Sequence, residues 1–156
     1  MKILIIEDDT NKSSAISEFL SKKEIGKCTI KESYHGGIKE LSEKGYDVVL
    51  LDMTMPVFDN SAYGNSGRPL PLAGRDLLFM VRRKKIHGHF IIITQYEDFN
   101  GMSLKALEDD LKANFPGLYH GIVYYNVMNN NWKAELLGLL STIKQEKGTT
   151  DENISS

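Results

Sequence analysis

The chain has 156 residues, a formal net charge of -2 at pH 7 and a sequence pI near 6.1. This length suits one domain, and the charge balance excludes an overall electrostatic attraction to nucleic acid or to anionic membranes. No apolar stretch approaches the roughly 18 residues of a transmembrane helix, and Lys2 leads directly into a strand instead of a signal-peptide core. We expect a soluble, cytoplasmic protein whose single cysteine, Cys28, is a buried strand residue without a disulfide partner.

Five short runs of apolar, often β-branched residues predict strands. The runs Ile3-Leu4-Ile5-Ile6 and Val48-Val49-Leu50-Leu51 are continuous, which is typical of strands buried on both faces of a parallel sheet. The predicted strands span residues 3–6, 27–31, 48–51, 90–93 and 122–125.

Apolar residues at helical spacing follow each of these strands and predict five helices. The residues that mark them are Ala15, Ile16, Phe19 and Leu20, then Tyr34, Ile38 and Leu41, then Leu77, Leu78 and Val81, then Leu104, Leu107 and Leu111, and finally Trp132, Leu136, Leu137, Leu140 and Ile143. Asp9 or Thr10, Ser33 and Ser103 are the expected N-caps of three of these helices. Strands that alternate with helices predict right-handed crossovers and an α/β, doubly wound parallel sheet with helices on both faces.

The predicted domain covers residues 1–147 and contains a long loop at residues 57–74. This loop carries turn residues without any apolar period, so we expect it to be functional or disordered. Residues 148–156 have little to bury and are predicted to form a disordered C-terminal tail.

Acidic residues follow two of the predicted strands. Glu7, Asp8 and Asp9 end the first strand, and Asp52 ends the third. Ligands of open α/β sheets bind beyond the carboxyl ends of the strands, so these carboxylates are expected to converge. Converging carboxylates repel one another, and a hard divalent cation removes the repulsion. The sequence therefore predicts a Mg²⁺ site, with Asp9 acting as a helix cap and not as a ligand.

Three motifs together resemble the receiver domain of two-component response regulators. They are Ile3-Leu4-Ile5-Ile6-Glu7-Asp8-Asp9, Tyr46-Asp47-Val48-Val49-Leu50-Leu51-Asp52-Met53-Thr54-Met55-Pro56 and Ile91-Ile92-Ile93-Thr94. The resemblance extends to about Lys147 and implies a flavodoxin-like (βα)5 fold. It also implies a receiver that takes part in a phosphorelay and signals through protein contacts. Because no residues after the last predicted helix could form an effector domain, we expect a single-domain protein.

The resemblance assigns roles to individual residues. Asp52 matches the aspartate that accepts a phosphoryl group from a phosphohistidine on a histidine kinase or phosphotransfer protein. Asp8 matches the direct Mg²⁺ ligand, Glu7 the acid that holds the ion through water, and Thr54 the residue whose backbone carbonyl is a further ligand. Thr94 matches the hydroxyl that starts the conformational switch. A bound magnesium ion would neutralise charge that develops during carboxylate attack on phosphorus.

The chain departs from the receiver pattern at the fifth strand, which normally ends in a lysine that pairs with the phosphoryl oxygens. Tyr125 stands at that position, or Asn126 if the register shifts by one, and neither supplies a positive charge. Gln95 follows Thr94 where many receivers carry a small residue, and its side chain is long enough to screen the pocket.

Two arginines are candidates for the cation that the fifth strand lacks. They are Arg68 in the long loop and Arg75 just after it, although the role of an ordinary solvated arginine is favoured for both.

Other basic and imidazole-bearing segments favour structural roles. The run Arg82-Arg83-Lys84-Lys85 falls at a predicted helix end, where cations complement the helix dipole, so no nucleic-acid partner is expected. The segment His87-Gly88-His89 offers too few ligands for a zinc site.

Two alternatives to a working receiver remain open. The first is a receiver-like protein-interaction module that is not phosphorylated, which the absent lysine and the long loop favour. The second is a phosphatase of the haloacid-dehalogenase type. That class requires a second acid two residues after its nucleophilic aspartate, and here the position is occupied by Thr54, which is not acidic. We therefore expect no enzyme beyond Mg²⁺-dependent self-phosphorylation and autodephosphorylation on Asp52.

Overall fold

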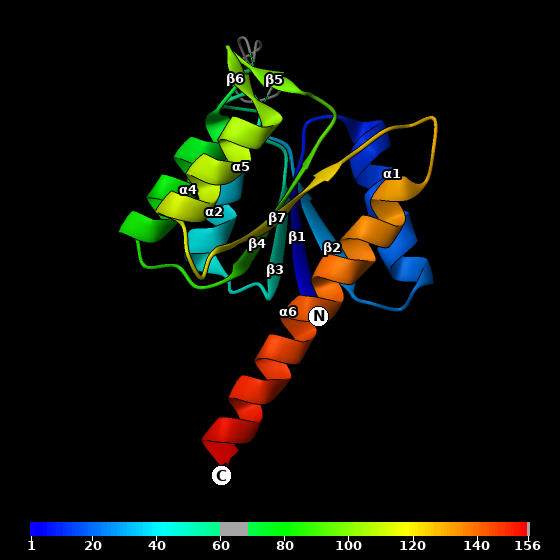
Figure 1. The fold of residues 1–156 in the computed structure, drawn as a ribbon, viewed down its shortest axis with the longest axis vertical. Helices are drawn as coiled ribbons and strands as arrows, with labels where there is room; N and C mark the ends of the chain where they lie inside the picture. The colour runs from blue at the N-terminus through cyan, green and yellow to red at the C-terminus, as the bar shows by residue number, and fades with distance from the viewer. Residues whose placement is uncertain (60–68, 156) are drawn as a thin grey trace.

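The computed structural model describes residues 1–59 and 69–155 and contains a five-stranded parallel sheet (Figure 1). The strands lie in the order β2-β1-β3-β4-β7. Their bounds are β1 Lys2–Ile6, β2 Lys27–Lys31, β3 Val48–Leu51, β4 His89–Thr94 and β7 Tyr119–Tyr124. This order is that of flavodoxin-like proteins, so the predicted fold class is confirmed.

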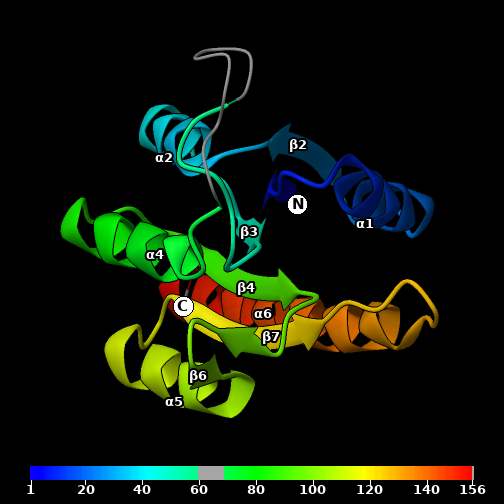
Figure 2. The same ribbon diagram turned by 90° about the horizontal axis from the view of Figure 1, so that it is seen from above.

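Five helices cover the two faces of the sheet. Their bounds are α1 Thr10–Lys22, α2 Tyr34–Glu43, α4 Ala73–Arg83, α5 Leu104–Asn114 and α6 Asn131–Ser155. Helices α1 and α6 pack on one face, while α2, α4 and α5 pack on the other, as Figure 2 shows. None of these described helices is both long and apolar enough to cross a membrane.

The predicted N-caps hold three of the helices. The side chain of Asp9 accepts a hydrogen bond from the Lys12 N–H at 3.2 Å, Ser33 accepts from Gly36 and Ser103 accepts from Ala106. Each cap satisfies a backbone donor that the first helical turn leaves without an internal partner. The cap at Asp9 starts α1 directly beside the end of β1, which brings the first turn of this helix to the carboxyl edge of the sheet.

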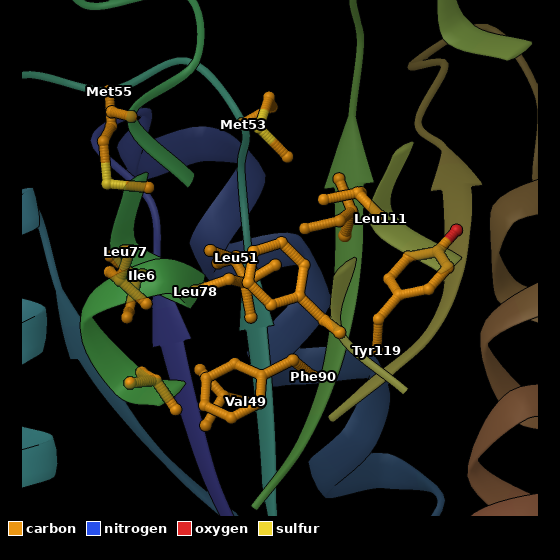
Figure 3. Packing of buried hydrophobic residues seen from close by; sticks show 14 of the residues in the cluster. Ile6, Val49, Leu51, Met53, Met55, Leu77, Leu78, Phe90, Leu111 and Tyr119 are labelled. Carbon is orange, nitrogen blue, oxygen red and sulfur yellow. The ribbon is translucent and has the colours of Figure 1, made fainter. Parts of the chain in front are cut away.

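Each face of the sheet has its own apolar core. On the side of α2, α4 and α5 the fully buried Phe90 packs among Val49, Leu51, Leu78 and other apolar side chains (Figure 3). On the other side Trp132 of α6 contacts Phe19 of α1 edge-on, with their ring centroids 5.4 Å apart. These two cores hold the strands in register and so fix the carboxyl edge where the predicted site lies.

Apart from shifts of one residue at strand ends, the structure differs from the sequence predictions in the following elements. A short antiparallel hairpin, β5 Asp98–Phe99 and β6 Met102–Ser103, was not predicted. Strand β7 begins three residues before the predicted strand, and α4 begins inside the predicted loop. The backbone of α6 is helical to Ser155, where we expected a disordered tail from residue 148. Gly148 lowers helix propensity without blocking the helix, unlike a proline. Residues 60–68 of the loop lie outside the described part.

Glu40 of α2 makes stability depend on pH. Its buried carboxylate accepts a hydrogen bond from the Tyr46 hydroxyl at 2.6 Å and pairs with Lys44 and Lys31. The Tyr46 hydrogen bond, aided by the lysines, lowers the pKa of Glu40 below its ordinary value of 4.5. A depressed pKa means that this carboxylate stabilises the folded protein above pH 4.5 and that the contribution is lost as the pH falls.

We therefore expect Glu40→Gln to make the loss of stability below pH 4.5 less steep. Urea unfolding at a series of pH values measures this. Glu43→Gln, an exposed position on the same helix, is the matched control. Identical acid profiles for the two variants would contradict the assignment.

Candidate functional site

The predicted site residues lie where three neighbouring strands end. Glu7 follows β1, Asp52 follows β3, and Thr94 is the last residue of β4. All three side chains are buried, with exposed fractions of 3%, 4% and 0%. Parallel pairing of β1 with β3 and of β3 with β4 aligns these strand ends, so the sheet itself gathers the side chains.

The centre of this site is Lys12, a residue that the sequence analysis did not single out. Its side chain is 1% exposed, and its ammonium group lies 2.6 Å from Glu7 Oε1 and 3.0 Å from Asp52 Oδ2. The ammonium also donates a hydrogen bond to the backbone carbonyl of Ile93 at 2.7 Å. One lysine on α1 therefore joins the ends of β1, β3 and β4. We call Glu7, Asp8, Lys12 and Asp52 the acidic pocket.

The surroundings of Lys12 are apolar, which strengthens its ion pairs. Side chains of Ile5, Ile16, Leu50 and Ile93 line the space beside the two carboxylates. Burial raises the pKa of Glu7 to about 8; Lys12 opposes this shift and Asp52 adds to it. Burial alone would lower the pKa of Lys12, but Asp52 and Glu7 raise it above the ordinary value of 10.5. Lys12 is therefore a firmly charged ammonium, which offsets the repulsion between the carboxylates.

The donor set of the acidic pocket fits a magnesium ion. Asp8, next to Glu7 in the chain, is exposed. Asp52 Oδ1 lies 3.4 Å from the Thr54 nitrogen, while Oδ2 faces Lys12. Ionised Asp8 and Asp52 oppose one ammonium, and a divalent cation would add the attraction that also favours the ionised form of Glu7 against its raised pKa. Magnesium prefers such oxygen ligands and commonly retains several waters. Asp8, Asp52 and the carbonyl of Thr54 are the residues that would hold it.

The other predicted site residues have local partners. The buried Thr94 hydroxyl accepts a hydrogen bond from the Tyr96 N–H at 3.1 Å, and Gln95 is exposed. Tyr125, directly after β7, is buried, and its ring centroid lies 5.7 Å from the Lys12 ammonium. Asn126 accepts a hydrogen bond from the Met128 N–H. Of these residues, Tyr125 is the one that the structure brings to Lys12, from the strand end where receivers carry their lysine.

Neither arginine candidate is shown to supply the cation. Arg75 pairs with Asp110 of α5, with Nε 2.6 Å from the carboxylate, so its proposed role in the pocket is wrong. Arg68 lies outside the described residues. Lys12 provides the charge instead. The signal was helical spacing, because Lys12 stands four residues before Ile16 and eight before Leu20, on the buried face of α1.

Comparison with known proteins identifies the family and agrees with this fold. The model of the response regulator receiver domain family matches residues 3–113. The Detocs response regulatory protein DtcB of Enterobacter cloacae (strain JD6301) is 32% identical over 145 residues, covering 88% of this chain and 96% of that protein. An uncharacterized protein, y4jR, of Sinorhizobium fredii (strain NBRC 101917 / NGR234) is 25% identical and covers 87% of this chain and 94% of its own.

Solved structures share the fold. The signal receiver domain of a putative Luxo repressor protein from Vibrio parahaemolyticus superposes with a TM-score of 0.67 at 16% identity, covering 95% of each chain. A CheY-like receiver domain protein from Methanospirillum hungatei JF-1 gives a TM-score of 0.65 at 18% identity, covering 95% of this chain and 97% of its own. The family match spans well over half of the sequence, and the sheet order and strand-end acids accord with it. The chain belongs to the response regulator receiver domain family of two-component signalling.

Proposed function

We propose that this receiver accepts a phosphoryl group on Asp52 from the phosphohistidine of a histidine kinase or phosphotransfer protein. A carboxylate oxygen of Asp52 attacks phosphorus while the bond between phosphorus and the histidine nitrogen breaks, and the nitrogen leaves with its electron pair. The observation that carries the proposal is the contact between Lys12 and Asp52 at 3.0 Å. It gives the pocket the cation that the fifth strand does not provide.

Lys12 takes the part of the strand-five lysine in this proposal. Its ammonium already faces Asp52 Oδ2, so it lies close to where the oxygens of a phosphoryl group on Asp52 would carry negative charge. A charged, preorganised donor in an apolar setting stabilises such charge more than the same donor does in water. Tyr125 stands where receivers carry a lysine, which would leave the phosphoryl group without a cation. In this proposal Lys12 supplies that cation.

Magnesium completes the charge balance of the site. When bound, the ion polarises the phosphoryl oxygens and offsets the charge that develops during transfer. One solved structure with the same fold, the response regulator TrrA of Thermotoga maritima, is a complex with Mg²⁺ and BeF, at 19% identity and a TM-score of 0.55. In our proposal the hydroxyl of Thr94, which is buried and accepts a hydrogen bond from the Tyr96 N–H, donates its own proton in a hydrogen bond to a phosphoryl oxygen and so starts the switch.

A phosphorylation assay tests the proposal. Acetyl phosphate with Mg²⁺ is expected to add one phosphoryl mass to the intact protein, and Asp52→Asn is expected to abolish the adduct. Asp59→Asn, an acid of the same loop region that is not part of the pocket, serves as the matched control and should leave the adduct unchanged. No adduct on the wild-type protein, or an adduct that persists in Asp52→Asn, contradicts the proposal.

The runner-up is a receiver-like interaction module that is never phosphorylated. The Lys12 ion pairs favour it as well, because they hold the carboxylates together without a phosphoryl group. The two functions differ in the assay above: an interaction module gives no adduct and binds its partner equally well with and without acetyl phosphate.

In either case the protein is a signalling module and not a metabolic enzyme. Receiver domains act through contacts with other proteins, and we propose a histidine kinase or phosphotransfer protein upstream and a protein target downstream. A cytoplasmic location stays a prediction, as do the absence of a nucleic-acid partner and of a membrane partner.

A further inference from the structure

Two histidines and a glutamate meet at the end of the sheet opposite the acidic pocket. His89 is the first residue of β4, His120 is the second residue of β7, and Glu146 belongs to α6. One ligand atom from each lies within 4.8 Å of the other two. The two imidazoles are in contact, with His89 Nδ1 2.7 Å from His120 Nε2. The segment around His89 offers too few ligands by itself, because its partners His120 and Glu146 come from distant parts of the chain.

A β-bulge in β7 is the feature that places His120. The pairing of β4 with β7 passes from Phe90 with Tyr119 to Ile91 with Gly121, so His120 has no opposite residue. Bulges of this kind alter the direction of a side chain, and they often lie beside functional sites. Here His120 is turned onto the His89 ring, with ring centroids 4.6 Å apart.

Helix α6 packs closely on β7 and carries the third ligand, Glu146. A side chain at Gly121 would meet Leu139 of α6 at 2.9 Å, so the helix lies against the backbone of β7 at this point. Glu146 stands seven residues after Leu139, which is two helical turns along the same face. Figure 1 shows α6 running past this end of the sheet.

The orientation of the rings suits metal binding. His120 faces His89 through Nε2, which lies 2.7 Å from His89 Nδ1. Two nitrogen ligands of a tetrahedral zinc ion lie about 3.3 Å apart, so the rings need to separate by only a fraction of an ångström. Both are half-buried, and His120 lines a groove between α5 and α6 that gives an ion access.

We propose that His89, His120 and Glu146 bind one divalent transition-metal ion of the zinc class, with a fourth position left to water. Two imidazoles and one carboxylate form a donor set that zinc takes in proteins. Such an ion would tie α6 to β4 and β7 at the end of the sheet that phosphorylation does not touch. The site is separate from the acidic pocket both in position and in chemistry, since imidazole favours zinc and carboxylate oxygen favours magnesium.

The test is a titration of metal-stripped, full-length protein with Zn²⁺ against a chromophoric chelator, in excess Mg²⁺ so that sites for hard cations are filled. We expect one equivalent to bind. His89→Ala and His120→Ala are each expected to weaken binding by more than about tenfold, and Glu146→Gln to weaken it as well. With Co²⁺ in place of Zn²⁺, the visible spectrum should show the bands of a four-coordinate ion.

The remaining two histidines of the chain provide matched controls. His35 and His87 are both exposed, and His87 stands only two residues from His89. His35→Ala and His87→Ala should bind Zn²⁺ as the wild-type protein does. Circular dichroism checks that each variant is folded, and His120→Gln replaces His120→Ala if the latter is not. The proposal fails if the wild-type protein binds no equivalent, if His87→Ala weakens binding as much as His120→Ala, or if Asp52→Asn abolishes it.

Discussion

Replacing Lys12 by methionine will lower the free energy of unfolding by about 3–5 kcal/mol. The methionine keeps the length of the side chain but removes the charge that faces Glu7 and Asp52 at 2.6 and 3.0 Å. Two buried carboxylates are then left without their cation, and the Ile93 carbonyl loses its donor. Urea denaturation in the presence of EDTA measures the loss without interference from divalent ions. The same variant is expected to accept phosphate from acetyl phosphate more slowly than the wild type.

Two further variants serve as a control and as a partial rescue for Lys12→Met. Lys22→Met removes an exposed lysine from the same helix, where it pairs with Glu18, and should change stability little. The double variant Glu7→Gln/Lys12→Met removes one carboxylate together with the cation and should recover part of the loss. Equal stability of Lys12→Met and the wild type would show that the ammonium is not buried between the carboxylates in solution.

Replacing Phe90 by alanine is expected to cost about 3–5 kcal/mol of unfolding free energy as well, through a different mechanism. Phe90 is fully buried at the centre of the core beneath α4 and α5 (Figure 3), and the smaller side chain leaves a cavity that fixed strands cannot fill. Thermal unfolding followed by circular dichroism measures the loss.

The matched control is Phe58→Ala. Phe58 is 36% exposed, and its ring lies 5.4 Å from that of His35, so the same substitution removes far less buried surface. Similar losses for the two phenylalanines would contradict the core described here. If Phe58→Ala is phosphorylated at the wild-type rate, the substitution leaves the acidic pocket unaffected, and any change in its stability has another origin.

Much of the fold could be predicted, because strands buried on both faces consist of unbroken apolar runs. The run at residues 48–51 coincides with β3 for this reason. The hairpin of β5 and β6 was missed although Asn100-Gly101 is a strong turn signal, and both residues have the positive φ that this turn needs. Its strands have two residues each, too few to show any alternation. The start of β7 was missed because its bulge at His120 has no sequence pattern.

The meeting of Glu7 and Asp52 in the candidate site could be predicted, because each of them follows a strand and strand ends meet at one edge of the sheet. Lys12 could not be placed by the same logic, since lysines in a first helical turn normally lie in water. The arginine assignment failed for a related reason: Arg75 is close to the site in sequence, but α4 turns it toward Asp110. The signal in the sequence was the helical spacing of Lys12 from the apolar residues Ile16 and Leu20, which places it on the same face of α1.

The position of Lys12 in the chain has a consequence for folding kinetics. Asp52 and Ile93 are 40 and 81 residues away from it along the sequence. The ammonium cannot leave water until the ends of β1, β3 and β4 are aligned, because a buried charge without partners is strongly unfavourable. These contacts should therefore form after the folding transition state, and losing them should speed unfolding while leaving the folding rate nearly unchanged. Lys12 then lengthens the lifetime of the folded protein more than it hastens its formation.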